Sequence, residues 1–215
     1  PATFFVQRVA MAMSHEEWLE KIKRKPLREE YTSLIEGGCE LCDKVSPGTW
    51  GQSTIKFRDR SLKEVPVVGV SSNRIDIVDL EVAEGRFHSL EDDLYKRRVA
   101  FLGHKVSQEL FEGLDPIGRD IRIGGRKYTV IGLGKEVGGL FGEEQDQRVY
   151  IPFSTHRRDF GSFDRSIHMV VKAASVAQLP EAMDQVRMVL RSARHVPFDK
   201  PDDFDILTAD MILEV

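Results

Sequence analysis

Residues 120–131 read Asp120-Ile-Arg-Ile-Gly-Gly-Arg-Lys-Tyr-Thr-Val-Ile131, two short β-favouring runs on either side of the pair Gly124-Gly125. A Gly-Gly pair between two such runs indicates a β-hairpin, because the tightest hairpin turn needs a positive φ at both central residues. This stretch therefore predicts two antiparallel strands joined by a two-residue turn.

The sequence around the hairpin has the same character, short strands separated by Gly-rich turns. Strands are predicted at 98–102 and 148–151, and the only helix-length piece is 103–111, with apolar residues at helical spacing. We therefore predict a small β-rich subdomain over residues 74–160.

The flanking parts, 1–73 and 161–215, have longer helices. The predicted elements are a strand at 3–6, a short helix after Ser14, a helix from Pro26 to Gly37-Gly38, strands at 45–57 (broken at Pro47-Gly48) and 64–70, a strand at 166–171, a helix over 179–190 and a strand at 204–207. The predicted fold is α+β, a split βαβ-type sandwich interrupted by the β-rich insert.

Length and charge exclude several classes of protein. A chain of 215 residues fits one large or two small domains, and 31 basic against 35 acidic residues, without a basic cluster, argue against nucleic-acid binding by bulk charge. The longest uncharged stretch, 45–55, is rich in Gly, Ser and Thr, so no membrane-spanning helix is predicted. The chain opens at Pro1 without Met and closes on an apolar run, so we expect a domain excised from a longer chain; the alternative is a trimmed complete protein.

The sequence offers no catalytic constellation. Gly132-Leu-Gly134-Lys-Glu-Val-Gly138 is one residue too long for a dinucleotide fingerprint, and Gly138-Gly139 would break the helix that a phosphate needs. No two of the six histidines are four residues apart, and each is expected at or near the surface. The carboxylates Glu91-Asp92-Asp93 and Glu143-Glu144 are expected on solvated faces. We predict a non-enzymatic protein without cofactor or metal.

Cys39 and Cys42 are the only cysteines. They follow the predicted end of a helix, where the helix dipole disfavours a thiolate, and a zinc site would need two further ligands. A small structural disulfide, reduced core thiols, and redox or metal chemistry are the interpretations left open.

Many weak motifs in a fixed order support a resemblance across nearly the whole chain. They are Glu84-Gly-Arg-Phe-His88, Arg98-Val-Ala-Phe-Leu-Gly103, Glu109-Leu-Phe111, Asp115-Pro-Ile-Gly118-Arg119, Tyr128-Thr-Val-Ile-Gly132, Leu140-Phe-Gly142 and Val149-Tyr-Ile-Pro152. The pattern resembles the periplasmic core domain of MacB-like and FtsX-like ABC transporter permeases.

The resemblance implies a domain on the periplasmic, extracytoplasmic side of the bacterial inner membrane, with a porter part (1–73 and 161–215) and a sabre part (74–160). The implied partners are a cytoplasmic ATPase subunit or domain acting through transmembrane helices, a second copy of the permease, and in some relatives a periplasmic adaptor and outer-membrane duct. Other relatives handle lipoproteins or regulate wall hydrolases. The implied function is non-enzymatic coupling of ATP hydrolysis to export, extraction or signalling. The alternative is a stand-alone small-molecule binding module or enzyme that uses the Gly132–Gly139 loop.

Two segments are candidate contact surfaces. The Gly-rich loop from Lys135 to Gln147 contains the apolar Val137, Leu140 and Phe141, which we predict to touch a partner; the alternative is that Phe141 lies in the core. The long charged stretch around Trp18 departs from the family pattern, and is either a local feature or a lineage-specific docking surface.

Overall fold

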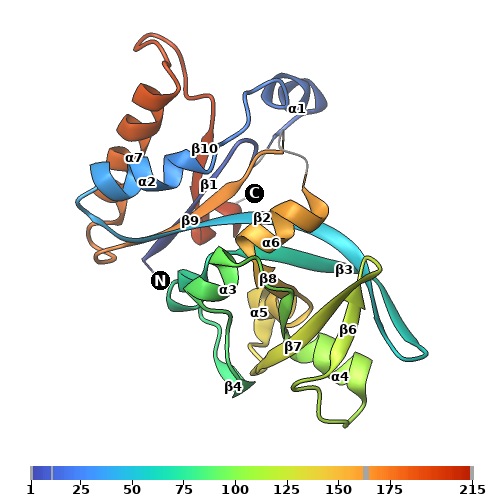
Figure 1. Cartoon of the computed structure of the whole chain (residues 1–215). Coiled ribbons are helices and arrows are strands. Elements are labelled where there is room, and N and C mark those ends of the chain that lie inside the picture. The colour runs from blue at the N-terminus through green and yellow to red at the C-terminus, as the bar shows by residue number, and fades with distance from the viewer. Residues whose placement is uncertain (1, 11, 162–164, 214–215) are drawn as a thin grey trace. The chain divides into compact units, whose positions relative to one another are not determined.

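The computed structural model describes residues 2–10, 12–161 and 165–213, and the chain forms two compact units. Unit 1 consists of Pro1–Gly48 and Asp164–Val215, and unit 2 of Thr49–Phe163. Figure 1 shows that unit 1 takes both ends of the chain, while unit 2 is one continuous segment.

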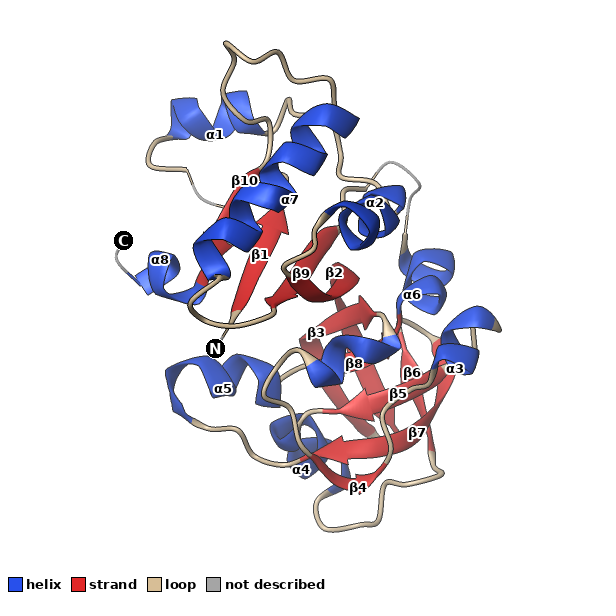
Figure 2. Ribbon diagram, turned by 90° about the vertical axis from the view of Figure 1, so that its left-hand side faces the viewer, coloured by secondary structure: helices blue, strands red, loops and turns tan. Residues whose placement is uncertain are grey.

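Unit 1 is a four-stranded antiparallel sheet with helices. Its elements are β1 (Thr3–Gln7), α1 (His15–Lys21), α2 (Glu30–Gly38), the first part of β2 (Cys42–Phe57), β9 (His168–Ala173), α7 (Leu179–Ala193), β10 (Asp205–Thr208) and α8 (Ala209–Leu213). The strand order is β10-β1-β9-β2. Strand β1 alternates half-buried and buried positions, so Phe4 and Val6 point into the core. The predicted helix over 179–190 is confirmed as α7, whose buried face includes Val186 and Leu190, and α7 packs with α2 (Figure 2).

Unit 2 is β-rich. Its elements are the second part of β2, β3 (Arg60–Val70), a 3₁₀ turn (Ser72–Asp76), β4 (Val82–Gly85), α3 (Leu90–Leu94), β5 (Val99–Leu102), α4 (His104–Phe111), β6 (Asp120–Ile123), β7 (Arg126–Gly134), α5 (Gly139–Asp146), β8 (Val149–Pro152) and α6 (Phe153–Phe160). The strands follow the order β3-β8-β5-β7-β4, and β6 pairs with β7 and with β2. The β3–β8 and β5–β7 pairs are parallel, and the others are antiparallel.

The predicted hairpin is confirmed. Strands β6 and β7 pair from Asp120 opposite Thr129 to Ile123 opposite Arg126, and Gly124 and Gly125 have φ of 57° and 82°. Side chains from both strands enter the core of unit 2, where Ile121 and Tyr128 are fully buried.

Close backbone packing explains the glycine at position 132. A Cβ added to Gly132 would lie 2.1 Å from the carbonyl oxygen of Arg86. A larger residue would therefore push the strand that holds Gly132 away from the backbone at Arg86. Gly132 and Gly134 both belong to β7, and α5 begins only at Gly139. The dinucleotide-binding geometry, with a helix opening at the glycines, is therefore not formed here.

The predicted start of the second helix at Pro26 is wrong, because α2 begins at Glu30. The segment before it is not helical and is held by other contacts: the Leu27 N–H donates to Ser166 Oγ (2.9 Å), and the Leu27 carbonyl accepts from the Ile167 N–H (3.2 Å). Leu27 is buried although it lies outside the helix.

The predicted break at Pro47-Gly48 is also wrong, since β2 continues through both residues, which pair with Met169 and His168 of β9. Pairing with β9, whose residues lie far along the chain, keeps β2 continuous through the proline.

The mixed α+β content is confirmed. The structure groups residues from Thr49 onward with the insert, whereas the sequence placed the boundary at 74, because β3 pairs with β8 inside unit 2. The description of the parts as a split βαβ-type sandwich with a sabre-like insert stays a prediction.

Candidate functional site

Much of the predicted contact loop, Lys135 to Gln147, is helical. Residues 139–146 form α5, although Gly138-Gly139 was expected to break a helix; these glycines have φ of 64° and 71° and lie at its start. The buried carboxylate of Asp146 orders the segment by accepting from the N–H groups of Val137 (2.9 Å) and Gly138 (3.1 Å).

The three predicted contact residues differ in what the structure says of them. Val137 packs against the core cluster of unit 2 that contains Phe87 and Tyr150, so its side chain has a structural role. The side chains of Leu140 and Phe141 lie outside the described residues, and their contact with a partner stays a prediction.

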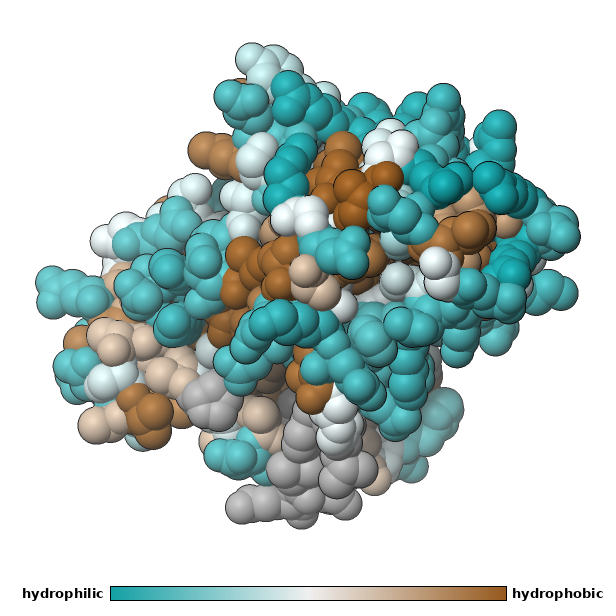
Figure 3. All heavy atoms as spheres, turned by 90° about the horizontal axis from the view of Figure 1, so that it is seen from below, coloured by the Kyte–Doolittle hydropathy of each residue, from teal (hydrophilic) through white to brown (hydrophobic). Residues whose placement is uncertain are grey.

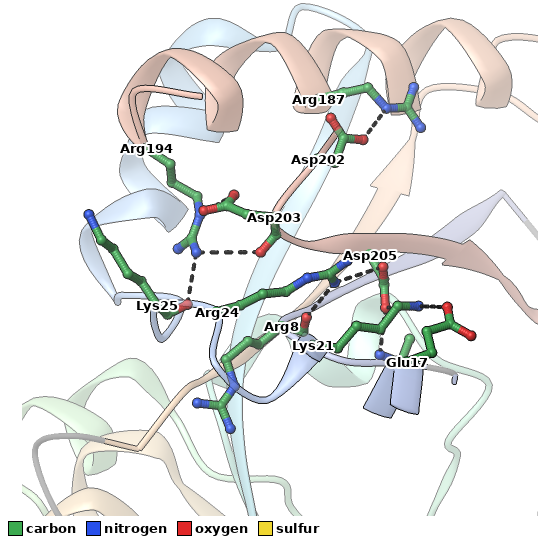
Figure 4. A network of polar contacts seen from close by, with 11 residues as sticks. Arg8, Glu17, Lys21, Arg24, Lys25, Arg187, Arg194, Asp202, Asp203 and Asp205 are labelled. Carbon is green, nitrogen blue, oxygen red and sulfur yellow. Dashed lines mark hydrogen bonds and ion pairs between the residues drawn. The ribbon is translucent and has the colours of Figure 1, made fainter. Parts of the chain in front are cut away.

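A polar network joins the N-terminal segment of unit 1 to β10 (Figure 4). The carboxylate of Asp205 accepts from Arg24 Nη1 (2.9 Å), from the Ala10 N–H (2.9 Å) and from Lys21 Nζ (3.5 Å). Burial alone would raise the pKa of Asp205, but these donors outweigh it and hold the pKa below its ordinary value. Asp205 is therefore a charged anchor for the whole segment.

Arg194 is the second centre of this network. Its side chain is 1% exposed, and it donates through Nε to Asp203 (2.7 Å), through Nη2 to the carbonyl of Lys25 (2.8 Å) and through Nη1 to the carbonyl of Pro26 (3.0 Å). These contacts connect the end of α7 to the segment that leads into α2.

Helix α1 depends on this network because it contributes nothing to the core. It has no buried residue, and Trp18 and Leu19 are 46% and 40% exposed. The predicted Ser14 cap is confirmed, since Ser14 Oγ accepts from the Glu17 N–H (3.1 Å). Strands β1 and β10 are antiparallel, with Phe4 opposite Thr208. The start of β1 and the end of β10 therefore lie at one end of the sheet, and α1 follows β1 at the opposite end.

Apolar side chains also reach the surface elsewhere. Figure 3 shows one face, on which hydrophobic residues lie among hydrophilic ones. In unit 1, Leu34 and Met188 border an apolar groove of about 820 Å³ between α2 and α7. Single exposed apolar residues are ordinary, whereas groups of them mark contact surfaces.

Unit 2 contains two buried carboxylates with arginine partners. Asp159 accepts from both Arg98 (2.9 and 3.2 Å) and Arg158 (2.9 and 3.3 Å), and from the Tyr128 hydroxyl (2.6 Å). Asp92, expected on a solvated face, is fully buried. Burial would raise the pKa of both aspartates, but the hydrogen bonds from their partners lower both well below the ordinary value.

Two of the histidines expected near the surface are buried. His88 Nε2 lies 2.7 Å from the Val70 carbonyl, and burial lowers the pKa of His88 to about 4. His156 lies between Thr49 Oγ1 (2.9 Å) and the Val67 carbonyl (3.1 Å). Within residues 2–10, 12–161 and 165–213, no group of three or more Asp, Glu, His or Cys side chains is placed to hold a metal ion.

Cys39 and Cys42 form a disulfide in the structure, with Cα atoms 5.4 Å apart. The bond joins the end of α2 to the start of β2, beside α7, where the Leu41 N–H donates to Gln185 Oε1 (3.1 Å).

Replacing both cysteines by alanine is expected to lower the free energy of unfolding by about 2 kcal/mol, the chain-entropy estimate for so short a loop. Urea denaturation of the oxidised protein and of the double variant measures this difference. Reductant should move the parent protein toward the variant and leave the variant unchanged; equal stability of both oxidised proteins would contradict the expectation.

Comparison with known proteins decides the family. The model of the MacB-like periplasmic core domain matches residues 2–189. The chain belongs to this family. It is 30% identical over 161 residues to the macrolide export ATP-binding/permease protein MacB of Bdellovibrio bacteriovorus, covering 74% of this chain and 24% of that protein. The chain thus spans about a quarter of that curated relative.

Solved structures agree on the fold. The periplasmic region of MacB from Actinobacillus actinomycetemcomitans superposes with a TM-score of 0.81 at 17% identity, over 99% of this chain and 91% of that one. The extracellular domain of the Gram-positive transporter YknZ gives 0.73 at 20% identity, over 96% and 100%. The predicted membership of the MacB-like family is confirmed. No helix in the described parts of the chain is long and apolar enough to cross a membrane.

Proposed function

We propose that this chain is the non-enzymatic extracytoplasmic domain of an ABC transporter permease and couples cytoplasmic ATP hydrolysis to movement of a substrate, or of a signal, outside the membrane. The observation that supports this most is the family match over residues 2–189, together with the fold likeness to the periplasmic region of MacB. Similar proteins include ATP-binding/permease proteins named for macrolide or pyoverdine export.

The strand arrangement of unit 1 suits a domain inserted between two membrane helices. Strands β1 and β10 are neighbours and antiparallel, so the chain enters β1 and leaves β10 at the same end of the sheet. A domain between two membrane helices needs its two ends close together. Helix α1 and the Asp205 network would then lie at the membrane-distal end of unit 1.

The proposed partners are an ATPase subunit or domain acting through the membrane helices, and a second copy of the permease. A periplasmic adaptor with an outer-membrane duct is a further proposed partner, for which α1, with exposed Trp18 and Leu19, is a contact surface. The proposed location is the periplasmic side of the bacterial inner membrane, as part of a membrane protein.

The small-molecule alternative has less support. This alternative needs the Gly132–Gly139 loop to be free to bind a ligand. Gly132, however, is packed against the Arg86 carbonyl, and the Val137 N–H donates a hydrogen bond to the Asp146 carboxylate. The segment thus has a structural explanation that needs no ligand.

The proposal is tested in the complete permease, reconstituted with its ATPase in liposomes. Replacing residues 2–213 by a short flexible linker should leave membrane insertion and basal ATP hydrolysis in place and abolish substrate movement. Transport at the parent rate without this domain would refute the coupling role. The 215-residue chain alone should not hydrolyse ATP, and hydrolysis by it would refute the non-enzymatic assignment.

Phe141→Ala is expected to leave folding largely intact and to weaken partner binding or export. Denaturation and transport are measured on the same variant, with Val137→Ala as the comparison, because Val137 packs on the core. A loss of about 3–5 kcal/mol, typical of a buried Phe→Ala change, would show instead that Phe141 is a core residue.

A further inference from the structure

Helix α3 presents a group of apolar side chains that the fold of unit 2 does not use. Leu90, Leu94 and Tyr95 are 73%, 70% and 66% exposed, and they lie within one turn and its C-terminal end. Leu90 and Leu94 are four residues apart and therefore lie on the same side of the helix. Figure 2 shows α3 at the outer surface of unit 2.

Basic side chains flank this apolar group. Arg86, Lys96 and Arg97 are exposed, and the Arg97 guanidinium lies over the Tyr95 ring, 5.4 Å from its centre. We call Arg86, Leu90, Leu94, Tyr95, Lys96 and Arg97 the α3 patch.

Asp92 holds two of these cations in place. It accepts from Arg86 Nη1 (2.6 Å) and Arg97 Nη1 (3.1 Å), while its own side chain is fully buried. The two arginine side chains remain 53% and 47% exposed, so each guanidinium keeps a solvent-facing side. Guanidinium groups fixed in this way lose little conformational freedom when they bind an anion.

The three cations of the patch are opposed by the exposed Glu91 and by the buried Asp92 beneath two of them, so one net positive charge remains, on a chain with a net charge of −4. Its exposed carboxylate neighbour is Glu91, 3.8 Å from Arg97. The side chain of Asp93 accepts from the Ser154 N–H (2.8 Å) and is directed toward α6 instead.

We propose that the α3 patch binds the surface of a membrane that carries anionic phosphate headgroups. Leucine and tyrosine insert at the boundary of the acyl region, and arginine and lysine pair with phosphates, the combination typical of interfacial anchors. A stable protein interface needs about 800 Å² from each partner, with a complementary face. The α3 patch is a single projecting turn, which is small for a protein interface. A bilayer surface needs no complementary face, because single side chains can insert into it. The proposal does not depend on the substrate or partners of the transporter.

The test is co-sedimentation of the 215-residue chain with phosphatidylcholine vesicles, with and without phosphatidylglycerol. Binding should require phosphatidylglycerol and weaken with salt. Leu90→Ser/Leu94→Ser should lower the partition constant about tenfold or more, and Arg97→Gln about fivefold. Glu91→Gln, which removes the exposed carboxylate, should strengthen binding.

The matched control is Met188→Ser/Phe198→Ser, which removes two apolar side chains that are 72% and 97% exposed in unit 1. This variant should bind as the parent does. Stronger vesicle binding by Glu91→Gln cannot arise from unfolding. This variant therefore shows whether the changes in binding come from the patch itself and not from loss of the fold. Absence of binding to anionic vesicles, or an equal loss in the control, would overturn the proposal.

Discussion

Replacing Asp159 by asparagine is expected to lower the free energy of unfolding by about 3 kcal/mol, because the substitution breaks a buried ion-pair network. Each carboxylate oxygen accepts from both Arg98 and Arg158, and one also accepts from the Tyr128 hydroxyl. Asparagine keeps the shape but turns one acceptor into a donor that faces guanidinium donors. The arginines stay partly solvated, which keeps the cost near the lower end for buried pairs.

The same substitution should change how the free energy of unfolding falls as the pH becomes acidic. Arg98, Arg158 and Tyr128 outweigh the effect of burial, so the pKa of Asp159 in the folded state lies below the unfolded value of about 3.9. A carboxylate with a lowered pKa contributes stability above the unfolded pKa and loses it as the pH falls toward the folded pKa. Asp159→Asn should therefore lose less stability between neutral pH and the acid range than the parent protein.

Urea denaturation across this pH range measures both effects. Asp184→Asn is the control, because Asp184 makes an exposed pair with Arg187 on α7 and should change little. If Asp159→Asn were as stable as that control, or kept the full acid dependence, Asp159 would not be an energetic centre of unit 2.

Local patterns predicted most of the regular elements. Gly124-Gly125 identified the β6–β7 hairpin, and the apolar stripe through Val186 and Leu190 identified α7, because both signals lie within a few neighbouring residues. The predicted start of α2 was wrong for the opposite reason: Pro26 favours a first turn locally, but Ser166, far along the chain, accepts the hydrogen bond of the Leu27 N–H outside the helix.

The polar centres could not be predicted from the sequence. The partners of Asp159 include Arg98, 61 positions earlier, and nothing local to the acidic run Glu91-Asp92-Asp93 shows that only its middle member is buried. The predicted contact loop was identified as a segment, but its order depends on Asp146, which carried no signal of burial. The cysteine pair had alternatives of similar weight, and only the fold placed Cys39 and Cys42 close enough to bond.

Replacing Arg194 by methionine is expected to cost unit 1 about 3 kcal/mol, since methionine has a comparable length and apolar volume but no donor. Two main-chain carbonyls, of Lys25 and Pro26, and the carboxylate of Asp203 would lose their partner. The carbonyls are the larger part of the cost, because Asp203 is 31% exposed and water can reach it.

Arg187→Met on the same helix, two turns earlier, is the matched control. Arg187 pairs with Asp184 and Asp202 while 36% exposed, so its loss should cost at most about 1 kcal/mol. Denaturant unfolding compares the two variants, and hydrogen exchange at Leu27 and Ile167 shows whether the segment before α2 loosens. Faster exchange there in Arg194→Met alone is expected, because Arg194 holds the two residues that precede Leu27. Equal costs for both variants would mean that Arg194 acts as an ordinary surface arginine, and α1 and its segment would then depend on Asp205 alone.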